Sequence, residues 1–373
     1  MILNFSKAVF LLIRMNLIIL FYKILHPSKK IIFFYNPNKH TTQNTSYIED
    51  LFEGFGKDFL FFFVFNSSHM IRHKHYYIKY NLLKWIYNVD IFFSNLVCDV
   101  FTRNSIKIYM HHDIYDTPMV NIEKEQELFN RLIKYDFLFL SNKKNTVMFN
   151  NFFTKYNADP KRKIPSLKEV GYIKLDFLKK NIKTPRPTNN TIVIAPTNCV
   201  AFDKFSMLDN LKEIIKILLT NQNLKIVFRP HPANRKNHIT LEIEKIFKND
   251  KNFKFDISND YFDTYLNSMC LMTDLSGTAY TYAFLTKKPI IFFSKNEKLI
   301  NNLEYNKLSF FRDRDKIGVV TKDLNEIKDA IKNIKYIEQR IKISNDLLEK
   351  EINYLGKSKE RIREVIGEIA IKK

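Results

Sequence analysis

The sequence predicts an α/β protein made of two doubly wound, Rossmann-type domains that face each other across a cleft. Short apolar runs, typical of buried parallel strands, alternate with segments of helical periodicity along both halves of the chain. The 373 residues are enough for two domains, and a hydrophobic content of 45% supplies two cores. The polar stretch 179–190 contains Pro185 and Pro187, which is the composition of a linker between the halves.

The net charge narrows the classes of partner. The chain carries 60 Lys and Arg against 39 Asp and Glu, which gives a formal net charge of +21 at pH 7. Such a charge indicates an anionic partner: a nucleic acid, an acidic membrane surface or a phosphorylated substrate. Nucleic acid is disfavoured because the sequence has no recognition-helix, RNP or zinc-finger pattern and its basic residues are spread along the chain.

The cysteines, histidines and glycines exclude several common sites. Cys98, Cys199 and Cys270 are widely separated, which fits a reducing compartment and argues against a disulfide framework or a structural zinc site. The histidines at positions 69, 73 and 75 match no standard zinc spacing, and we expect them in a solvated loop. The 7 glycines form neither GxGxxG nor GxxxxGK[ST], so a nucleotide site must be built differently. We expect no metal and no cofactor.

The N-terminus, residues 1–29, forms a segment of its own. It contains basic but no acidic side chains, and its apolar run is interrupted by Arg14, Asn16 and Lys23. A spanning helix needs about 20 uninterrupted apolar residues, and no signal-peptide cleavage site follows. We predict a basic amphipathic helix that lies on an anionic membrane surface. The alternatives are a single transmembrane anchor and an ordinary helix buried against the sheet that follows.

Residues 30–184 form the first predicted domain. Its strands are short runs rich in Phe and Ile, and the second is continuous enough to be buried on both faces. The predicted strands are Ile31–Tyr35, Phe59–Phe65, Ile91–Ser94, Ile106–Met110 and Phe137–Ser141. The predicted helices are Ser46–Phe55, Glu123–Ile133 and Thr146–Tyr156.

Residues 185–340 form the second predicted domain, and residues 341–373 form C-terminal helices. The whole tail from Leu324 to Lys373 is predicted to be helical, with heptad-like apolar spacing. The predicted strands of the second domain are Thr191–Ala195, Lys225–Phe228, Phe253–Asp256, Cys270–Met272 and Ile290–Phe293. The predicted helices are Asp203–Leu219, Ile239–Phe247, Tyr261–Asn267 and Thr278–Leu285.

Polar residues follow three strands of the second domain. These segments are Pro196-Thr197, Arg229-Pro230-His231-Pro232 and Thr273-Asp274-Leu275-Ser276-Gly277. In a doubly wound sheet, loops at the carboxyl ends of strands open onto one crevice. Arg229 has the geometry to pair bidentately with a phosphate, and the backbone around Ser276 and Gly277 has the amides to cradle a second one. The alternative is that Asp274 and Ser276 only cap the helix that follows.

Three histidines are candidate catalytic residues. His231 lies between two prolines, and an imidazole held at a phosphate site donates a hydrogen bond or stabilises developing charge. His111 and His112 follow a first-domain strand, so one of them projects toward the same cleft as a candidate general base, oriented by Asp113 or Asp116. The alternatives are a loop-capping histidine at 231 and a pair of surface histidines at 111 and 112.

Taken in order, these motifs resemble those of the CDP-glycerol glycerophosphotransferases, GT-B-fold enzymes that build teichoic acids and related capsular polymers. That family carries a YAPT strand end, an R-x-HP segment and a TDYSS…KPIIFY segment in the same order. The matching segments here are Ala195–Thr197, Arg229–Pro232, Thr273–Gly277 and Lys288–Phe293. Val170–Leu178 is similar to the family's GYPR-x-D-x-L segment. The resemblance covers roughly residues 90–325.

The resemblance implies a role for each matching residue. His231 matches the family's second catalytic histidine. The residues implied in donor binding are Arg229, Pro196, Thr197, Thr273, Asp274, Ser276 and Gly277. The family's first catalytic histidine lies in a WHG segment, and the corresponding residues here are Met110-His111-His112-Asp113, without the Trp or a following Gly, so either histidine is the match. The second serine of the family's serine pair is Gly277 here.

These expectations combine into a predicted phosphotransferase. It moves glycerol phosphate, or a related polyol phosphate, from a CDP-linked donor to a hydroxyl of a lipid-linked or growing cell-surface glycan and releases CMP, with no metal required. The resemblance also implies peripheral attachment to the cytoplasmic face of the plasma membrane. The alternatives are a GT-B nucleotide-sugar glycosyltransferase in capsule or lipopolysaccharide assembly and a catalytically inactive membrane scaffold.

Overall fold

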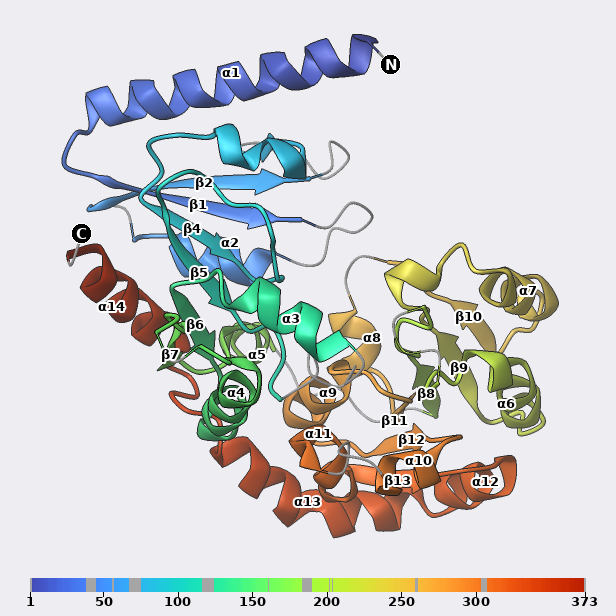
Figure 1. Cartoon of the computed structure of the whole chain (residues 1–373). Helices are drawn as coiled ribbons and strands as arrows, with labels where there is room; N and C mark the ends of the chain where they lie inside the picture. Colours follow the sequence, from blue (N-terminus) through green and yellow to red (C-terminus); the bar gives the residue numbers. More distant parts are fainter. Residues whose placement is uncertain are drawn as a thin grey trace. The chain divides into compact units, whose positions relative to one another are not determined.

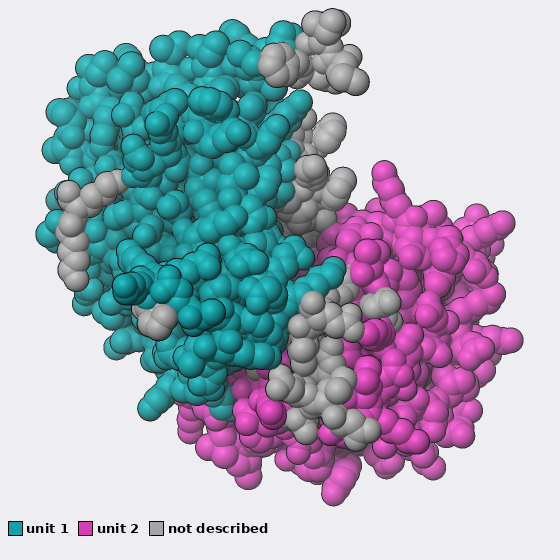
Figure 2. All heavy atoms as spheres, in the orientation of Figure 1, with its two compact units in different colours: residues 1–112, 124–176, 353–373 teal, residues 113–123, 177–352 magenta. Residues whose placement is uncertain are grey.

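The computed structural model confirms an α/β architecture with two parallel sheets (Figure 1). It describes residues 2–37, 45–55, 57–66, 75–115, 124–159, 161–182, 190–200, 202, 204–258, 261–302 and 307–371. The chain forms two compact units (Figure 2). Unit 1 comprises residues 1–112, 124–176 and 353–373, and unit 2 comprises residues 113–123 and 177–352. The C-terminal segment therefore belongs to the first unit.

Unit 1 contains a seven-stranded parallel sheet in the order β3-β2-β1-β4-β5-β6-β7. Its strands are β1 (Lys30–Asn36), β2 (Phe59–Phe65), β3 (His75–Tyr77), β4 (Ile91–Ser94), β5 (Ile106–Met110), β6 (Phe137–Leu140) and β7 (Ser166–Glu169). The central strands are almost wholly buried, as expected where helices cover both faces of a parallel sheet. Two short edge strands, β3 and β7, lack a long apolar run and were not predicted. His75, expected in a loop, begins β3, whereas His69 and His73 lie outside the described residues.

The helices of unit 1 are α1 (Ile2–Leu25), α2 (Ser46–Phe52), the 3-10 helix η2 (Tyr80–Trp85), α3 (Glu125–Leu132), α4 (Lys143–Tyr156), the start of α5 (Ile173–Lys180) and α14 (Ser358–Ile371). The bounds of α2, α3 and α4 match the predicted helices within a few residues, whereas η2 and α5 were not predicted. Asn142 caps α4, because its side chain accepts a hydrogen bond from the backbone of Asn145.

Helix α1 docks on unit 1 through two of the polar residues that interrupt its apolar run. Asn16 Nδ2 donates to the carbonyl of Trp85 (2.9 Å), and Asn16 Oδ1 accepts from the backbone N–H of Tyr87 (3.0 Å). Lys23 Nζ donates to the carboxylate of Asp90 (2.8 Å). The polar residues of this helix thus attach it to the protein.

The opposite face of α1 is apolar and exposed. The exposed side chains on it are Phe10, Ile13, Leu17, Leu20, Phe21 and Ile24. Figure 1 shows the helix alongside the part of the sheet that contains β1 and β2, and its Tyr22 ring packs against Phe62 of β2. Within the described residues, α1 is the single helix long and apolar enough to cross a membrane. Met15 and Ile19 are buried on the inner side, so α1 carries apolar side chains on both its buried and its exposed faces.

Unit 2 contains a six-stranded parallel sheet in the order β10-β9-β8-β11-β12-β13. Its strands are β8 (Thr191–Ile194), β9 (Lys225–Phe228), β10 (Phe253–Phe255), β11 (Cys270–Thr273), β12 (Ile290–Phe293) and β13 (Gly318–Thr321). Its helices and 3-10 turns are η5 (Leu208–Asn210), α6 (Leu211–Leu219), η6 (Pro232–Asn234), α7 (His238–Phe247), α8 (Phe262–Leu266), α9 (Thr278–Thr286), α10 (Glu297–Asn302), α11 (Ser309–Arg312), η8 (Arg314–Lys316), α12 (Leu324–Lys332) and α13 (Ile334–Lys350).

Helix α6 begins later than the sequence predicts. The predicted helix starts at Asp203, but the described residues before Leu208 are not helical. The reason is tertiary, because the backbone N–H of Met207 donates to the carboxylate of Asp274 rather than to a preceding carbonyl. The delayed start leaves the segment before the helix free to form part of the loop region described below.

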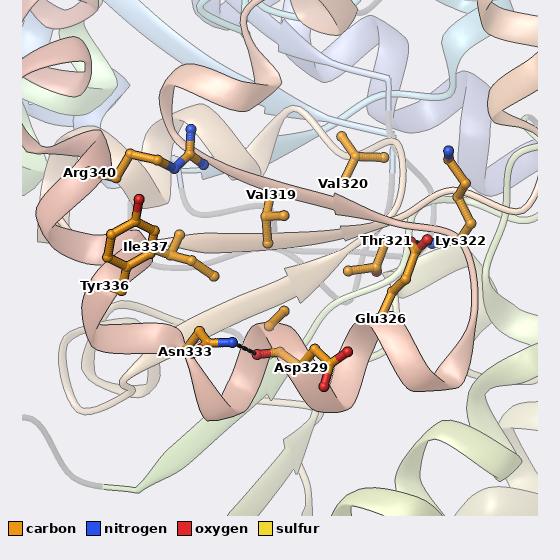
Figure 3. A pocket seen from close by; sticks show the side chains of 11 residues that line it. Val319, Val320, Thr321, Lys322, Glu326, Asp329, Asn333, Tyr336, Ile337 and Arg340 are labelled. Carbon is orange, nitrogen blue, oxygen red and sulfur yellow. Dashed lines mark hydrogen bonds between the residues drawn. The ribbon is translucent and has the colours of Figure 1, made fainter.

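A hollow of 660 Å³ lies beside the edge strand β13 (Figure 3). Val319 and Thr321 of β13 line one side, and Tyr336 and Arg340 of α13 line another. Arg340 is held there by hydrogen bonds to the carbonyls of Asp315 and Gly318. The hollow is separated in the sheet order from β8 and β9, whose loops carry the predicted site.

Candidate active site

The three predicted loops of unit 2 follow three neighbouring strands. In the sheet order, β8 lies between β9 and β11, so the loops after these strands emerge side by side at one edge. The order of the strands switches at β8: β9 and β10 lie on one side of it, and β11, β12 and β13 lie on the other. Doubly wound sheets bind ligands at such a switch point. Thr273 Oγ1 donates to the carbonyl of Ala195 (2.6 Å), which joins the ends of β11 and β8 directly.

Asp274 links these loops through its buried carboxylate. Oδ1 accepts from the backbone N–H groups of Thr197 (2.8 Å) and Leu275 (2.6 Å), and Oδ2 accepts from that of Met207 (2.8 Å). Burial raises the pKa of Asp274 to about 6 despite these hydrogen bonds. The side chain is 5% exposed, so it organises the loop backbones from within. Pro196 and Thr197 are buried beside it.

Asn234 makes the equivalent link between the β9 and β8 loops, and the sequence did not single it out. Its Nδ2 donates to the carbonyl of Thr197 (2.7 Å), and its Oδ1 accepts from the backbone N–H of Cys199 (3.2 Å). The residue is fully buried. Its partners lie more than thirty residues away in the chain, so local sequence gives no signal for this role.

His231 is held in one tautomer. It caps η6, and its Nδ1 accepts a hydrogen bond from the backbone N–H of Ala233 (3.1 Å). An amide can only donate, so the neutral ring carries its proton on Nε2. Burial lowers the pKa of His231 to about 4, and the charge of Arg235 contributes to the shift. At neutral pH, His231 therefore presents an uncharged Nε2–H donor.

Arg229 is largely occupied by partners within the protein. Its Nη1 donates to Asp256 Oδ2 (2.8 Å) and Ser258 Oγ (3.0 Å), and its Nη2 donates to the carbonyl of Ser258 (2.7 Å). Its guanidinium also lies over the ring of Tyr261, 5.7 Å from the centroid. Arg229 thus braces the β9 loop against the segment after β10. Asp256 and Ser258 were not predicted to take part.

The last predicted donor residues, Ser276 and Gly277, lie at the start of α9. Gly277 is its N-cap, and the following amides point toward the loop. A Cβ at Gly277 would lie 2.5 Å from Asp113 Oδ1, so the carboxylate of Asp113 occupies the space that a serine side chain would need. Asp113 and Gly277 are both positions at which the motifs depart from the family's WHG and SS patterns, and these two departures lie against each other.

In unit 1, the two candidate histidines differ in exposure. His111 is 3% exposed and packs edge-on against the ring of Phe149. His112 is partly exposed. Tyr109 Oη lies near Nδ1 of both rings, at 3.3 Å from His111 and 3.4 Å from His112. Tyr172 Oη donates to the carbonyl of His112 (3.1 Å) and fixes its backbone. Asp116, the other predicted orienting residue, lies outside the described residues.

Two further motifs act in folding. Asp176 accepts hydrogen bonds from the backbone N–H groups of Gly356 (2.7 Å) and Ser358 (3.0 Å), so it anchors the start of α14. Gly171 has φ +87°, and a Cβ there would overlap the side chain of Ser358. Lys288 Nζ donates to the carbonyls of Leu266 and Ser268 and is buried. These contacts give Gly171 and Asp176 of the segment Val170–Leu178, and Lys288 of the segment Lys288–Phe293, structural roles that need no ligand.

Within the residues that the structure describes, no group of three His, Cys, Asp or Glu side chains is placed to hold a metal ion. The described residues of the site supply imidazole, guanidinium, hydroxyl and backbone amide groups. Such groups suit an anionic substrate, because they donate hydrogen bonds to oxygen and offset negative charge.

Comparisons with known proteins agree with this reading of the motifs. The family model of CDP-Glycerol:Poly(glycerophosphate) glycerophosphotransferase matches residues 18–368. Among curated proteins, no sequence matches significantly.

The solved structures that resemble this one establish the fold. The wall teichoic acid polymerase TagF superimposes with a TM-score of 0.64 at 17% identity, over 92% of this chain and 90% of that one. A TagF variant soaked with CDPG gives 0.65 at 18% identity, over 92% and 90%. A putative UDP-N-acetylglucosamine 2-epimerase from Listeria monocytogenes gives 0.58 at 13% identity, over 90% and 94%. The two-sheet architecture is thus GT-B-like, as predicted.

Proposed function

Because this chain belongs to the CDP-glycerol:poly(glycerophosphate) glycerophosphotransferase family, we propose specific roles for its residues in transfer of glycerol phosphate from CDP-glycerol. Family membership confirms the predicted enzyme class and the predicted donor. The observation that carries the residue assignment is the cross-linked set of loops after β8, β9 and β11. Buried side chains hold them together, and they present an uncharged imidazole donor and a helix N-terminus on neighbouring strands.

Unit 2 binds the donor in this proposal. The diphosphate accepts hydrogen bonds from His231 Nε2–H and from the backbone at Ser276 and Gly277. Pro196, Thr197, Thr273 and Asp274 keep these groups in place. Because the donor groups are set by the fold before the reaction, they stabilise the charge that develops on the phosphoryl oxygens without reorganising.

The reaction transfers one phosphoryl group and one proton. An acceptor hydroxyl oxygen attacks the β-phosphorus, and the bond from that phosphorus to the bridging oxygen of CMP breaks. His112 takes the hydroxyl proton, and CMP leaves with the bridging oxygen and its electron pair. We assign the base to His112 because His111 is buried among aromatic rings, whereas His112 is partly exposed. The acceptor is a hydroxyl of a lipid-linked or growing cell-surface glycan.

A donor screen tests this function. The full chain is incubated with CDP-glycerol, another CDP-polyol or a UDP-sugar, together with a poly(glycerol phosphate) acceptor, and CMP and UDP are measured. We expect acceptor-dependent release of CMP from CDP-glycerol and its loss in His231→Ala, with His238→Ala as the matched control because that histidine is exposed on α7. Release of UDP from a sugar donor, with none of CMP, would make the chain a glycosyltransferase instead.

We propose in addition that α1 attaches the enzyme to the cytoplasmic face of the membrane. Its outward side chains are apolar, as Leu17 (60% exposed) and Phe21 (59%) illustrate. A groove of 510 Å³ between α1 and the segment 85–88 continues this surface and is lined mainly by Leu, Ile, Trp and Tyr side chains. No acidic residue precedes Glu49 in the sequence, which favours contact with anionic lipid.

Liposome sedimentation tests the attachment. The double variant Leu17→Glu with Phe21→Glu should lose binding to vesicles that contain anionic phospholipid. Ile343→Glu is the matched control, because Ile343 is 75% exposed on α13. Equal binding by the α1 variant and the wild type would place the membrane contact on another part of the protein.

A further inference from the structure

The sequence predicts that Arg229 binds a phosphate, but in the structure its guanidinium donates its hydrogen bonds to other residues of the protein. Three of its N–H groups donate to Asp256 and Ser258. Asp256 is buried, and its carboxylate also accepts from the backbone of Ser258 (2.9 Å) and from Thr264 Oγ1 (3.1 Å). The charge of Arg229 is thus matched by a carboxylate within the protein. To bind a phosphate with the same groups, Arg229 would have to give up contacts that hold the loop.

Arg235 lies on the same loop as Arg229, but part of its guanidinium has no acceptor within the described protein. Its Nε is buried and makes no hydrogen bond with any residue that the structure describes. A buried guanidinium N–H without an acceptor is costly, so such a group calls for an anion. The positive charge of Arg229 lies near enough that it lowers the pKa of Arg235, after the larger effect of burial. Asp256 also acts on Arg235, but its oxygens are already shared by three other donors.

The β9 loop places Arg235 next to the donor group of His231. The two residues flank the single turn of η6, and Asn234 within that turn is locked to the neighbouring loop by its hydrogen bond to Thr197. His231 Nδ1 is bonded inward to Ala233, which leaves its Nε2–H for a ligand. The loop thus carries an imidazole donor and a guanidinium donor on one rigid turn.

We propose that Arg235 is the arginine that binds the diphosphate of the donor nucleotide, and that Arg229 is a positioning residue that braces the loop through Asp256. This inference rests on the proposed function of the site. Arg235 and His231 together bind the phosphoryl oxygens, and the ligand supplies the acceptor that the buried Nε–H of Arg235 lacks. A planar guanidinium suits this ligand because it donates two parallel hydrogen bonds to phosphate.

The test compares nucleotide affinity with thermal stability for the full chain, with CDP-glycerol and CDP as probes in calorimetry. Arg235→Ala should weaken binding of both probes by about 30-fold, which corresponds to about 2 kcal/mol, and should leave the melting temperature close to that of the wild type. Arg235→Lys, which keeps the charge but loses the fork, should recover part of the affinity. Lys236→Ala, an exposed neighbour, is the matched control.

Arg229 should behave differently if it is a positioning residue. Arg229→Ala and Asp256→Asn should lower the melting temperature by similar amounts, and their effects on affinity should not add in the double variant. Wild-type affinity in Arg235→Ala, or a large loss of affinity in Arg229→Ala at an unchanged melting temperature, would overturn the assignment while leaving the proposed function intact. Failure of the wild-type protein to bind either probe would instead overturn the proposed function.

Discussion

The loop after β5 in unit 1 and the loop after β9 in unit 2 each place a histidine at the end of a parallel strand, but they hold it differently. Nδ1 of His112 lies near a tyrosine hydroxyl, which is able to donate or accept a hydrogen bond. Nδ1 of His231 accepts from a backbone amide, which only donates. The first arrangement leaves both tautomers of the ring open, and the second fixes an Nε2–H donor. This difference agrees with the roles proposed for the two histidines, His112 as the base and His231 as the phosphate-binding group.

The two loops also differ in how they are braced. The β9 loop is tied to its neighbours by the buried side chains of Asn234 and Asp256, and Asp274 joins the β8 and β11 loops beside it. In unit 1, Tyr109 lies against both histidine rings, Tyr172 bonds the backbone of His112, and the backbone N–H of His111 donates to the carbonyl of Phe139. We expect substitution of the residues that brace the β9 loop, such as Arg229 and Asp256, to alter stability and affinity together, and substitution of His112 to alter turnover alone.

The largest expected effect separates the two adjacent histidines of unit 1. His112→Ala should lower the rate of CMP release by about 1,000-fold, as for loss of a general base, and should leave CDP affinity and melting temperature unchanged. His111→Ala should mainly lower the melting temperature, because its ring is buried against Phe149. Turnover assays, calorimetry and thermal melts check both. If His111→Ala abolished turnover in a fully stable protein, the assignment of the base would be reversed.

The next effect tests the bracing of the β9 loop and its neighbours. Asp274→Ala removes the acceptor of three buried backbone amides and should cost about 3 kcal/mol of unfolding free energy. Asp315→Ala, at an exposed position in the same unit, should cost little and serves as the control. Urea denaturation measures both. A small loss in Asp274→Ala would mean that this carboxylate does not hold the loops together.

A smaller effect should appear in the pH dependence of stability. His231 has a pKa of about 4 in the folded protein, against 6.5 for the unperturbed group. Between these values the unfolded chain binds a proton that the folded chain does not, so this group destabilises the fold as the pH falls. The loss is about 2 kcal/mol when its partial exposure is allowed for.

Asp274 acts in the opposite sense between pH 3.8 and about 6, because its folded pKa is raised and the folded state there holds the extra proton. The pH dependence of stability of the wild-type protein therefore contains opposing contributions from His231 and Asp274. His231→Gln should lose less stability than the wild type between pH 6.5 and 4.5 in denaturant titrations. A constant difference between the two proteins over that range would contradict the buried, neutral imidazole.

The smallest expected effect on stability concerns Asp113 and Gly277, which lie against each other and both depart from the family's motifs. Gly277→Ala should destabilise the protein by about 1 kcal/mol, because its new Cβ meets the carboxylate of Asp113. Asp113→Gly should relieve that clash, so the double variant should be more stable than the sum of the single variants predicts. Thermal melts of the four proteins give the coupling. Simple additivity would show that Asp113 does not occupy the space beside Gly277.

Local patterns predicted the elements whose signal lies in one segment. The central strands were predicted almost to the residue, because Phe- and Ile-rich runs such as β2 cannot be solvated. Helix α9 was predicted within one residue. The edge strands β3 and β7 were missed because an edge requires no long apolar run. The start of α6 was misplaced because a carboxylate from a distant strand captures the backbone of Met207.

The predicted site residues fall into two groups for the same reason. Residue type and position at a strand end identified His112, His231, Ser276 and Gly277 as loop residues. The hydrogen bonds that distinguish them come from elsewhere in the chain. The sequence shows that a guanidinium follows the β9 strand, but not that Asp256 engages Arg229. The role proposed for Arg235 has no local signal, because it rests on a buried Nε whose surroundings are set by the folded loop.

The sequence by itself determined the two parallel sheets, the order of the motifs and, through those motifs, the family. It could do so because hydrophobic periodicity and residue type at strand ends are local properties of the chain. Tertiary structure decided which residues brace the site and which of them present hydrogen-bond donors. It also decided that Asn16 and Lys23 attach α1 to the protein while the apolar face of that helix is exposed. These features depend on contacts between distant segments, and the free energy of such contacts exists only once the chain has folded.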